Sequence, residues 1–326
     1  MTETVLVTGA TGFIGLALVK RLSAAGQRVR CLVRAGSDVS RLPPGAELVR
    51  GDLLDSGSFE AALKGVSLVW HLGALVRPKG FLVSRKKLTE QFNSLNAGAT
   101  GELARAAARA GVKRFIYFSS ISALGPGENL GDDSGPRPIT LYGKSKLAGE
   151  AALKEAARGG LDYVILRPAM IYGPGSAAWA PLFDSIRRGK ALGPGEAGNT
   201  FSVCYLENLL DAALLAAGKA GSGAALNISE GSLTLRELFL TLGRLAGRRP
   251  VIIGLPVNLL KAVSGALDGL LGLAGLSMPG FIAADRARVE EACANWSHAS
   301  EGLRALGWRP AVTTEKGLAA SLGGRP

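Results

Sequence analysis

The sequence predicts an α/β fold built on a doubly wound parallel sheet with helices on both faces. Short apolar runs alternate with segments of helical spacing over the first half of the chain, a pattern typical of parallel strands buried on both sides. The alternation stops near residue 168, where glycine and proline become frequent. The chain has 326 residues, 47% of them hydrophobic and 20% charged, so it can bury a sizeable core and most of it cannot be disordered.

The predicted strands are apolar runs that polar or glycine-rich stretches separate. In chain order they cover residues 5–7, 29–33, 48–49, 68–72, 115–118 and 164–166. Helices are predicted over residues 13–25, 88–110 and 141–158, and the last two carry lysine or arginine on the faces that we expect to be exposed. Strands and helices that alternate in this way form parallel βαβ units.

We expect a first domain over residues 1–168 and a smaller second domain formed mainly by residues 169–326. Gly-Pro-Gly sequences at 173–175 and 193–195 indicate loops that leave the sheet and return. A further strand near residues 225–229 is predicted to rejoin the first sheet, so the boundary need not be a single cut.

The net charge and the distribution of basic residues limit the classes of binding partner that we expect. The formal net charge of +12 favours an acidic ligand or an anionic surface, although an ordinary basic protein would show it too. Basic residues occur only in short clusters, such as 85–87 and 187–190, which form no recognisable nucleic-acid module. We therefore expect no nucleic-acid partner.

The cysteine content and the N-terminal sequence indicate in which cell compartment the protein is expected. Cys31, Cys204 and Cys293 lie far apart without any CxxC pair, so we expect neither a disulfide framework nor a bound metal. The first residues have no basic region and no cleavage site of a signal peptide. Both observations favour the reducing cytoplasm.

A glycine-rich loop follows the first predicted strand. In the stretch TGATGFIG, Gly9, Gly12 and Gly15 are spaced three apart, and a helix follows. Glycine permits a tight turn and close approach of the backbone to a ligand, and a helix N-terminus offers N–H groups and a positive dipole to a pyrophosphate. The loop therefore predicts a dinucleotide site. Further contacts are expected from its other residues, Thr11, Phe13 and Ile14.

This spacing departs from GxGxxG and resembles that of the extended short-chain dehydrogenase/reductase superfamily, the NAD-dependent epimerase/dehydratase family. Asp52 and Leu53 resemble the family's pair beside the adenine, and Leu72, Gly73 and Ala74 resemble the end of its fourth strand. The resemblance covers nearly the whole chain and implies a Rossmann domain that binds NAD or NADP.

Two further segments carry the same resemblance. Asn96 and Thr100 resemble the family's NxxGT helix, although Ala99 replaces the usual glycine. The LGWRP sequence at 306–310 recurs in the superfamily.

The end of the second strand bears on the choice between NAD and NADP. An acidic residue there would bond the ribose 2′-hydroxyl, whereas this chain has Arg34, whose guanidinium can hold a 2′-phosphate. NADP is therefore favoured as the cofactor. If Arg34 only stacks over adenine or points to water, NAD remains usable.

A YxxxK pattern begins the helix predicted over 141–158. Tyr142 and Lys146 stand one turn apart on one face, and an ammonium beside a phenol is expected to lower the pKa of the phenol toward working pH. The family resemblance assigns proton transfer to Tyr142. It also implies that Lys146 holds the nicotinamide ribose. It also matches Ser120 to the hydroxyl that bonds the substrate oxygen, with Ser122 as a weaker candidate.

The sequence RPAMIYGP at 167–174 resembles the family's segment after the sixth strand. Pro168 and Ile171 are expected there to contact the nicotinamide. Arg167 is as compatible with pairing to a helix end as with touching a ligand.

These features predict an NAD(P)-dependent carbonyl reductase or alcohol dehydrogenase. Nucleotide-sugar members usually carry an arginine for the diphosphate before a VxD motif, and Phe201 stands at that position here. The stretch resembles dihydroflavonol-reductase-like and 3β-hydroxysteroid-dehydrogenase-like members, whose substrates are apolar.

The alternative is a nucleotide-sugar epimerase or dehydratase that retains NAD. Against a dehydratase, Ile121 and Ser122 stand where that subgroup carries an acidic pair. A cofactor-sensing protein with a dormant site is less compatible with the intact YxxxK.

Residues 251–282 form an apolar segment that Lys261 and Asp268 interrupt, so a membrane-spanning helix is not expected. A pair of buried helices explains such a segment most simply, and an apolar lid over the substrate or a surface that touches lipid would also do so. The family resemblance further implies a homodimer through the helices at 88–110 and 141–158.

Overall fold

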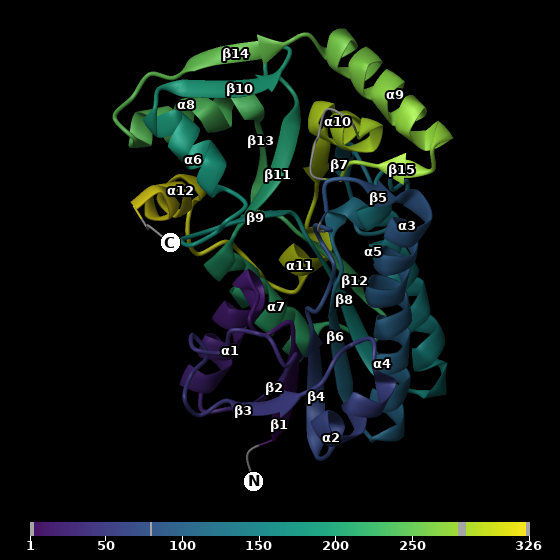
Figure 1. Ribbon diagram of the computed structural model, residues 1–326. Coiled ribbons are helices and arrows are strands. Elements are labelled where there is room, and N and C mark those ends of the chain that lie inside the picture. Colours follow the sequence, from purple (N-terminus) through teal and green to yellow (C-terminus); the bar gives the residue numbers. More distant parts are fainter. Residues whose placement is uncertain (1–2, 79, 280–284, 324–326) are drawn as a thin grey trace.

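The computed structural model describes residues 3–78, 80–279 and 285–323 (Figure 1). Its central element is a seven-stranded parallel sheet with the strand order β12-β8-β6-β4-β1-β2-β3. The strands are β1 (Thr4–Thr8), β2 (Arg28–Val33), β3 (Glu47–Arg50), β4 (Val66–His71), β6 (Arg114–Phe118), β8 (Asp162–Pro168) and β12 (Ala225–Ile228). The predicted doubly wound α/β class is confirmed.

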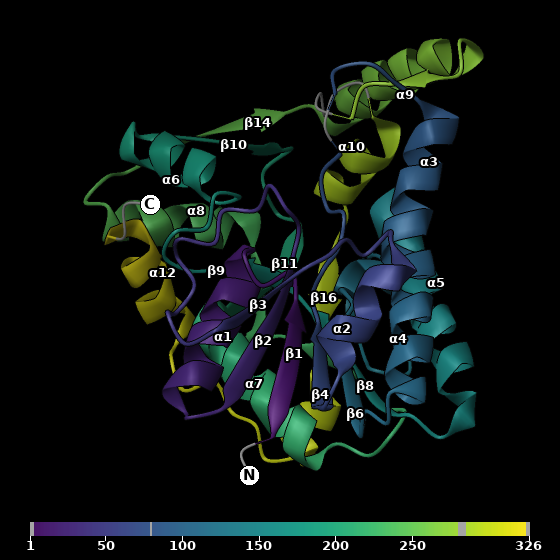
Figure 2. The same cartoon turned by 60° about the horizontal axis from the view of Figure 1, so that its bottom comes forward.

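Helices cover both faces of this sheet (Figure 2). One face carries α1 (Phe13–Ala24) and α7 (Leu206–Lys219), and the other carries α2 (Phe59–Leu63), α4 (Ala99–Arg109) and α5 (Leu141–Ala156). Side chains of β1 alternate between the two cores: Val5 and Val7 enter the first, and Leu6 enters the second. Because both faces of the sheet are buried, its strands consist of continuous apolar runs, and these runs are the pattern from which the strands were predicted.

The connection from β4 to β6 is a long helical stretch. A short strand β5 (Val83–Ser84) leads into α3 (Arg85–Asn93), which continues through a π-helical turn (Ser94–Gly98) into α4. Short 3-10 helices lie at Ser56–Ser58, Ile121–Ala123 and Ala157–Gly159.

A second unit lies over the carboxyl ends of the parallel strands (Figures 1 and 2). It holds a five-stranded sheet made of β7 (Gly127–Leu130), β9 (Met170–Tyr172), β11 (Thr200–Tyr205), β13 (Gly231–Thr234) and β16 (Trp296–His298). Beside it, β10 (Lys190–Pro194) pairs in parallel with β14 (Val251–Leu255). The helices of this part are α6 (Ala180–Arg187), α8 (Leu235–Leu245), α10 (Arg286–Cys293) and α12 (Thr314–Gly323). A short helix, α11 (Glu301–Ala305), packs instead against β12 of the large sheet.

Each of the two sheets contains a strand from the other half of the chain. β12 comes from the second half of the chain and pairs with β8 in the large sheet, whereas β7 comes from the first half and pairs with β16 in the small sheet. The domain boundary predicted at residue 168 therefore stays a prediction.

The apolar segment 251–282 forms β14, then α9 (Val257–Leu273) and then β15 (Leu276–Ser277), which pairs with β5. In α9 only Ser264 is buried, so the buried helix pair suggested by the sequence is not formed. The apolar composition of this segment suggested buried helices, but apolar residues occupy the solvent-facing side of α9. Residues 280–282 lie outside the described part of the chain. No helix in the described ranges is long and apolar enough to cross a membrane.

Candidate active site

The loop after β1 requires glycine at two positions. Gly9 has φ +68°, and a Cβ there would lie 2.8 Å from the backbone nitrogen of Gly73 at the end of β4. A Cβ on Gly15 would lie 2.1 Å from the carbonyl oxygen of Gly9. The loop thus packs directly against the neighbouring strand end and against its own helix.

The N-terminus of α1 is open for an anion. Gly12 caps the helix without any side-chain hydrogen bond, and the first turn holds no acidic residue. A Cβ on Gly12 would meet only the Gly9 carbonyl oxygen, at 3.2 Å, so the space beyond is free for a ligand. Thr11 is exposed, and Phe13 and Ile14 are half-buried. This glycine cradle with its helix dipole fits a dinucleotide pyrophosphate.

The other residues predicted to hold the cofactor lie along the same edge of the sheet. Leu53 packs on Gly73, because a Cβ built on Gly73 would lie 2.3 Å from Leu53 Cδ1. The Asp52 carboxylate accepts a hydrogen bond from the Leu54 amide at 2.9 Å. Arg34 is exposed just after β2, and Leu72 and Ala74 are half-buried after β4. Parallel strands bring these ends together although they lie far apart in sequence.

Ser120 and Tyr142 line one cavity of about 800 Å³. Ser120 Oγ accepts a hydrogen bond from the Ser122 amide at 3.1 Å, so Ser120 itself caps the turn after β6. Thr140 caps α5 by accepting from the Gly143 amide at 3.1 Å, which fixes the start of the helix that carries Tyr142. Burial raises the pKa of Tyr142 to about 12, against a lowering by its hydrogen bond with Ser120, while Glu291 raises it further.

Lys146 lies behind these groups and is buried. Its Nζ donates to the carbonyl oxygen of Phe118 at 2.5 Å and lies 4.3 Å from the ring centre of Tyr117. Burial lowers the pKa of Lys146 to about 7, and Glu150 opposes this by raising it. The lowering of the Tyr142 pKa that the sequence predicts from Lys146 stays a prediction.

A buried ion pair holds α5 on the sheet. Arg167 of β8 donates to both carboxylate oxygens of Glu150, at 2.9 and 2.7 Å, and Ser119 donates to Glu150 at 2.6 Å. Arg167 therefore pairs with a helix and belongs to the scaffold. Pro168 is buried at the end of β8, and Ile171 on β9 is half-buried.

A polar chain connects the glycine loop to the long helical stretch. Thr8 Oγ1 lies 2.7 Å from His71 Nδ1, and His71 Nε2 lies 3.0 Å from Thr100 Oγ1. Thr100 donates to the carbonyl oxygen of Asn96, whose side chain bonds both the backbone of Leu75 and Ser145. Burial, followed by the charge of Lys146, lowers the pKa of His71 to about 3, so the imidazole is neutral. His71 is not among the site residues predicted from the sequence.

The cavity wall joins residues from both halves of the chain. Its apolar lining includes Leu88, Phe92, Ile121, Met170, Phe201 and Trp296. Its charged lining includes Arg77, Arg85, Lys144, Asp268, Asp285, Arg288 and Glu291. A second cavity of about 550 Å³, between residues 131–134 and 301–305, holds none of the predicted site residues.

Glu291 on α10 is a candidate that sequence analysis missed. It faces the same cavity as Tyr142, and its side chain accepts no hydrogen bond from the described residues. Burial raises its pKa, Arg288 lowers it and Asp285 raises it. No local motif surrounds Glu291, so only the packing of α10 reveals it.

Comparison with known proteins identifies the family. The model of the NAD-dependent epimerase/dehydratase family matches residues 5–229. The chain belongs to this family. Its resemblance to the extended short-chain dehydrogenases is thereby confirmed, as is the prediction of an enzyme of that type.

Named relatives of this epimerase/dehydratase family member include reductases and epimerases. It is 29% identical over 329 residues to the 2-alkyl-3-oxoalkanoate reductase of Stenotrophomonas maltophilia, covering 96% of this chain and 97% of that one. It is 32% identical over 224 residues to the 3 beta-hydroxysteroid dehydrogenase/Delta 5-->4-isomerase of Mycobacterium tuberculosis, covering 65% of this chain and 60% of that one. It is also 32% identical over 221 residues to the UDP-glucose 4-epimerase of Vibrio cholerae, covering 65% of each.

Solved structures share the fold. MoeE5 in complex with UDP-glucose and NAD superposes with a TM-score of 0.74 at 27% identity, covering 98% of this chain and 97% of that one.

Proposed function

We propose that this protein is an NADP(H)-preferring carbonyl reductase or alcohol dehydrogenase for a hydrophobic substrate. The observation that carries the proposal is the cavity of about 800 Å³, in which Ser120 and Tyr142 face many apolar side chains. Phe201, at the position where nucleotide-sugar members carry a diphosphate-binding arginine, lies in its wall. A cavity of this size and lining suits a molecule with a carbonyl or hydroxyl group on an apolar body.

In reduction, Tyr142 donates its phenolic proton to the substrate oxygen and Ser120 donates a hydrogen bond to the same atom. A bound nicotinamide supplies the hydride. With its pKa raised to about 12, Tyr142 is protonated near neutral pH, which is the form required for donation. Lys146, when charged, stabilises the phenolate that remains, and Glu150 supports that charge.

The preference for NADP rests on Arg34. Its side chain is exposed just beyond β2 and has no ion-pair partner within the described residues. A free guanidinium at this strand end can hold a 2′-phosphate by charge-assisted hydrogen bonds. Gly9, Gly12 and Gly15 would hold the pyrophosphate.

A nucleotide-sugar epimerase or dehydratase that retains NAD is the second candidate. UDP-glucose 4-epimerase is among the relatives, and MoeE5 holds UDP-glucose and NAD. Arg77 and Arg288 also line the cavity, and arginines there could bind a diphosphate.

Cofactor content separates these candidates. Freshly purified protein is denatured, any released nucleotide is identified by chromatography and mass, and the emptied protein is titrated with NADPH and NADH. We expect no stoichiometric nucleotide and tighter binding of NADPH. Arg34→Ala should weaken NADPH more than NADH, whereas Arg41→Ala, an exposed arginine of the same loop, should change neither. Stoichiometric NAD after purification would instead support the epimerase.

Tyr142→Phe tests the assigned chemistry. Because it removes the transferable proton and little else, turnover should fall by at least about a hundredfold while NADPH binding is retained. Tyr163→Phe, a half-buried residue of β8 outside the cavity, serves as the matched control. Undiminished turnover in Tyr142→Phe would refute the assignment.

A homodimer and a cytoplasmic location remain part of the proposal. The expected dimer helices correspond to the stretch ending in α4 and to α5, which pack against each other on one face of the sheet.

A further inference from the structure

The apolar stripe of α9 faces away from the protein. Leu259, Val263, Ala266, Leu270 and Leu273 follow one another at intervals of four, three, four and three residues, so they share one side of the helix. The four larger side chains, Leu259, Val263, Leu270 and Leu273, are 59, 43, 67 and 89% exposed. A surface helix normally turns such a stripe toward the core. Here the stripe forms an apolar surface without a partner in the described chain.

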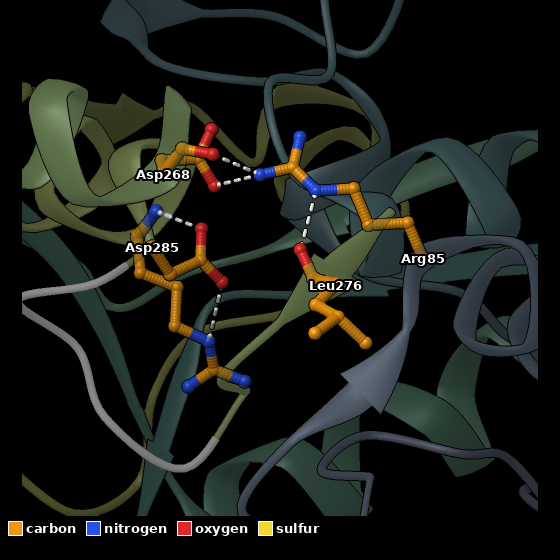
Figure 3. Close-up of polar contacts among 5 residues, drawn as sticks. Arg85, Asp268, Leu276 and Asp285 are labelled. Carbon is orange, nitrogen blue, oxygen red and sulfur yellow. Dashed lines mark hydrogen bonds and ion pairs between the residues drawn. The ribbon is translucent and has the colours of Figure 1, made fainter. Parts of the chain in front are cut away.

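The opposite side of α9 is anchored. Arg85 donates to the Asp268 carboxylate at 2.8 Å and to the Leu276 carbonyl oxygen at 2.8 Å, which ties α9 and β15 to the start of α3 (Figure 3). Asp268 lies two residues from Ala266, roughly half a helical turn around the axis. The ion pair therefore fixes the orientation of α9, in which Leu260, Leu267 and Leu271 are half-buried and the stripe faces outward.

A second apolar group lies beside the end of α9. Phe81 and Leu82 are 73 and 50% exposed and directly precede β5, which pairs with β15. The Arg85 amide donates to the Gly275 carbonyl oxygen at 2.9 Å, so this loop and the end of α9 are neighbours. We call the stripe of α9 together with Phe81 and Leu82 the apolar tip.

Positive charge lies beside the apolar tip, at the start of α3. Lys86 and Lys87 on the first turn of α3, directly after β5, are exposed, and neither forms an ion pair within the described residues. Lys261 of α9 is also exposed, but it lies seven residues before Asp268 and shares the side of the helix opposite to the stripe. The sole carboxylate of α9, Asp268, is already paired with Arg85. Apolar side chains with unpaired cations beside them match the surface of an anionic bilayer. The same cations would repel one another if the tip were covered by a second copy of this chain.

The apolar tip also adjoins the cavity. Arg85, Asp268 and Ser277 line the same cavity as Ser120 and Tyr142. The anchoring residues of the tip are thus part of the wall of the candidate active site.

We propose that the apolar tip docks onto the surface of an anionic lipid bilayer and that an apolar substrate reaches the cavity from the membrane through this side. The docking stands independently of the reaction, and only the route of the substrate rests on the proposed function. No helix of the described ranges is suited to span the bilayer, and α9 would lie along its surface.

Vesicle sedimentation tests the docking without any measurement of turnover. Full-length protein is mixed with vesicles of phosphatidylcholine alone or of phosphatidylcholine with phosphatidylglycerol, and the bound fraction is measured at low and high salt. We expect binding to the anionic vesicles that salt weakens, and much less binding to the neutral ones.

Variants locate the contact. Leu270→Gln/Leu273→Gln should reduce partitioning by at least about tenfold, because both side chains would enter the hydrocarbon boundary. Leu240→Gln is the matched control: Leu240 is 46% exposed on α8, which lies on the other side of the second unit from α9 (Figure 1), and this variant should bind as the unmodified protein does. Lys86→Glu/Lys87→Glu should lower binding to the anionic vesicles while leaving the leucines in place.

Three outcomes would overturn the proposal. The unmodified protein could stay unbound with anionic vesicles, or Leu270→Gln/Leu273→Gln could bind as well as it does. Light scattering could also show that the unmodified protein is an oligomer that ignores vesicles and that the leucine variant is a monomer, in which case a second copy covers the tip. Equal thermal midpoints for all variants would establish that they are folded.

Discussion

Burial acts on Tyr142 and Lys146 in opposite directions. It raises the pKa of the phenol to about 12 and lowers the pKa of the ammonium to about 7, because in both cases it penalises the charged form. Near neutral pH the phenol is thus protonated and the lysine only partly charged. The YxxxK spacing places the two groups on one helix face, but it cannot state how deeply each is buried.

Glu291 should tune the pH dependence of oxidation, which requires the phenolate of Tyr142. Its carboxylate raises the pKa of Tyr142, so Glu291→Gln should lower that pKa and move the alkaline rise of the oxidation rate to lower pH. The measurement is kcat against pH in the oxidative direction. Glu290→Gln, the neighbouring residue that pairs with Arg286, is the control. An unmoved profile in Glu291→Gln would show that this carboxylate does not act on Tyr142.

At the scale of elements, α5 is the part that organises the site. Tyr142, Lys146 and Glu150 follow at intervals of four residues, so one helix face presents the phenol, the amine and the carboxylate that binds β8. The clamp between Glu150 and Arg167 is 1 and 7% exposed at its side chains. It fixes the helix relative to the strand ends where the cofactor loop lies.

Removing one partner of the ion pair between Glu150 and Arg167 should lower the free energy of unfolding. Arg167→Met leaves the Glu150 carboxylate buried with little compensation, for which we expect a loss of about 3–5 kcal/mol in the free energy of unfolding. Chemical denaturation measures it. Adding Glu150→Leu to Arg167→Met should recover much of the loss, since the unpaired charge is then removed.

Arg114→Met is the matched control for the clamp. Arg114 pairs with Asp162 at 3.1 Å with side chains 21 and 34% exposed, so about 1 kcal/mol or less of ion-pair stabilisation is at stake there. Equal losses for Arg167→Met and Arg114→Met would contradict the role given to the buried pair.

At the scale of the whole molecule, a neutral histidine lies buried in each unit. His71 ends β4 in the large sheet and His298 lies in β16 of the small sheet, and burial lowers the pKa of both, that of His71 to about 3. Between that pKa and the value of about 6.5 in the unfolded chain, the unfolded state binds more protons. Stability should therefore fall as pH drops from about 6.5 toward 3.

The contribution of His71 can be isolated. His71→Gln should be less stable near neutral pH, but its free energy of unfolding should fall less steeply with acid, by up to about 1.4 kcal/mol per pH unit. Denaturation midpoints across this pH range give the slope. Parallel curves for His71→Gln and the unmodified protein would show that His71 is not held neutral by the fold.

The parallel sheet, the glycine loop and the YxxxK helix could all be predicted from the sequence. These features are local: a strand buried on both faces must be apolar throughout, Gly9 and Gly15 leave no room for a side chain, and a four-residue interval joins Tyr142 and Lys146 whatever surrounds them.

The tertiary structure alone decided what depends on contacts between distant segments. The sequence was compatible with Arg167 contacting either a ligand or a helix, and the structure places its guanidinium 2.7 Å from the Glu150 carboxylate of α5. Glu291 has no motif and reaches the cavity only because α10 packs there, and the apolar pattern of α9 reads as a core helix although the stripe faces outward. Burial and pairing are properties of the assembled chain, so periodicity can state that a helix is amphipathic but not which of its sides meets water.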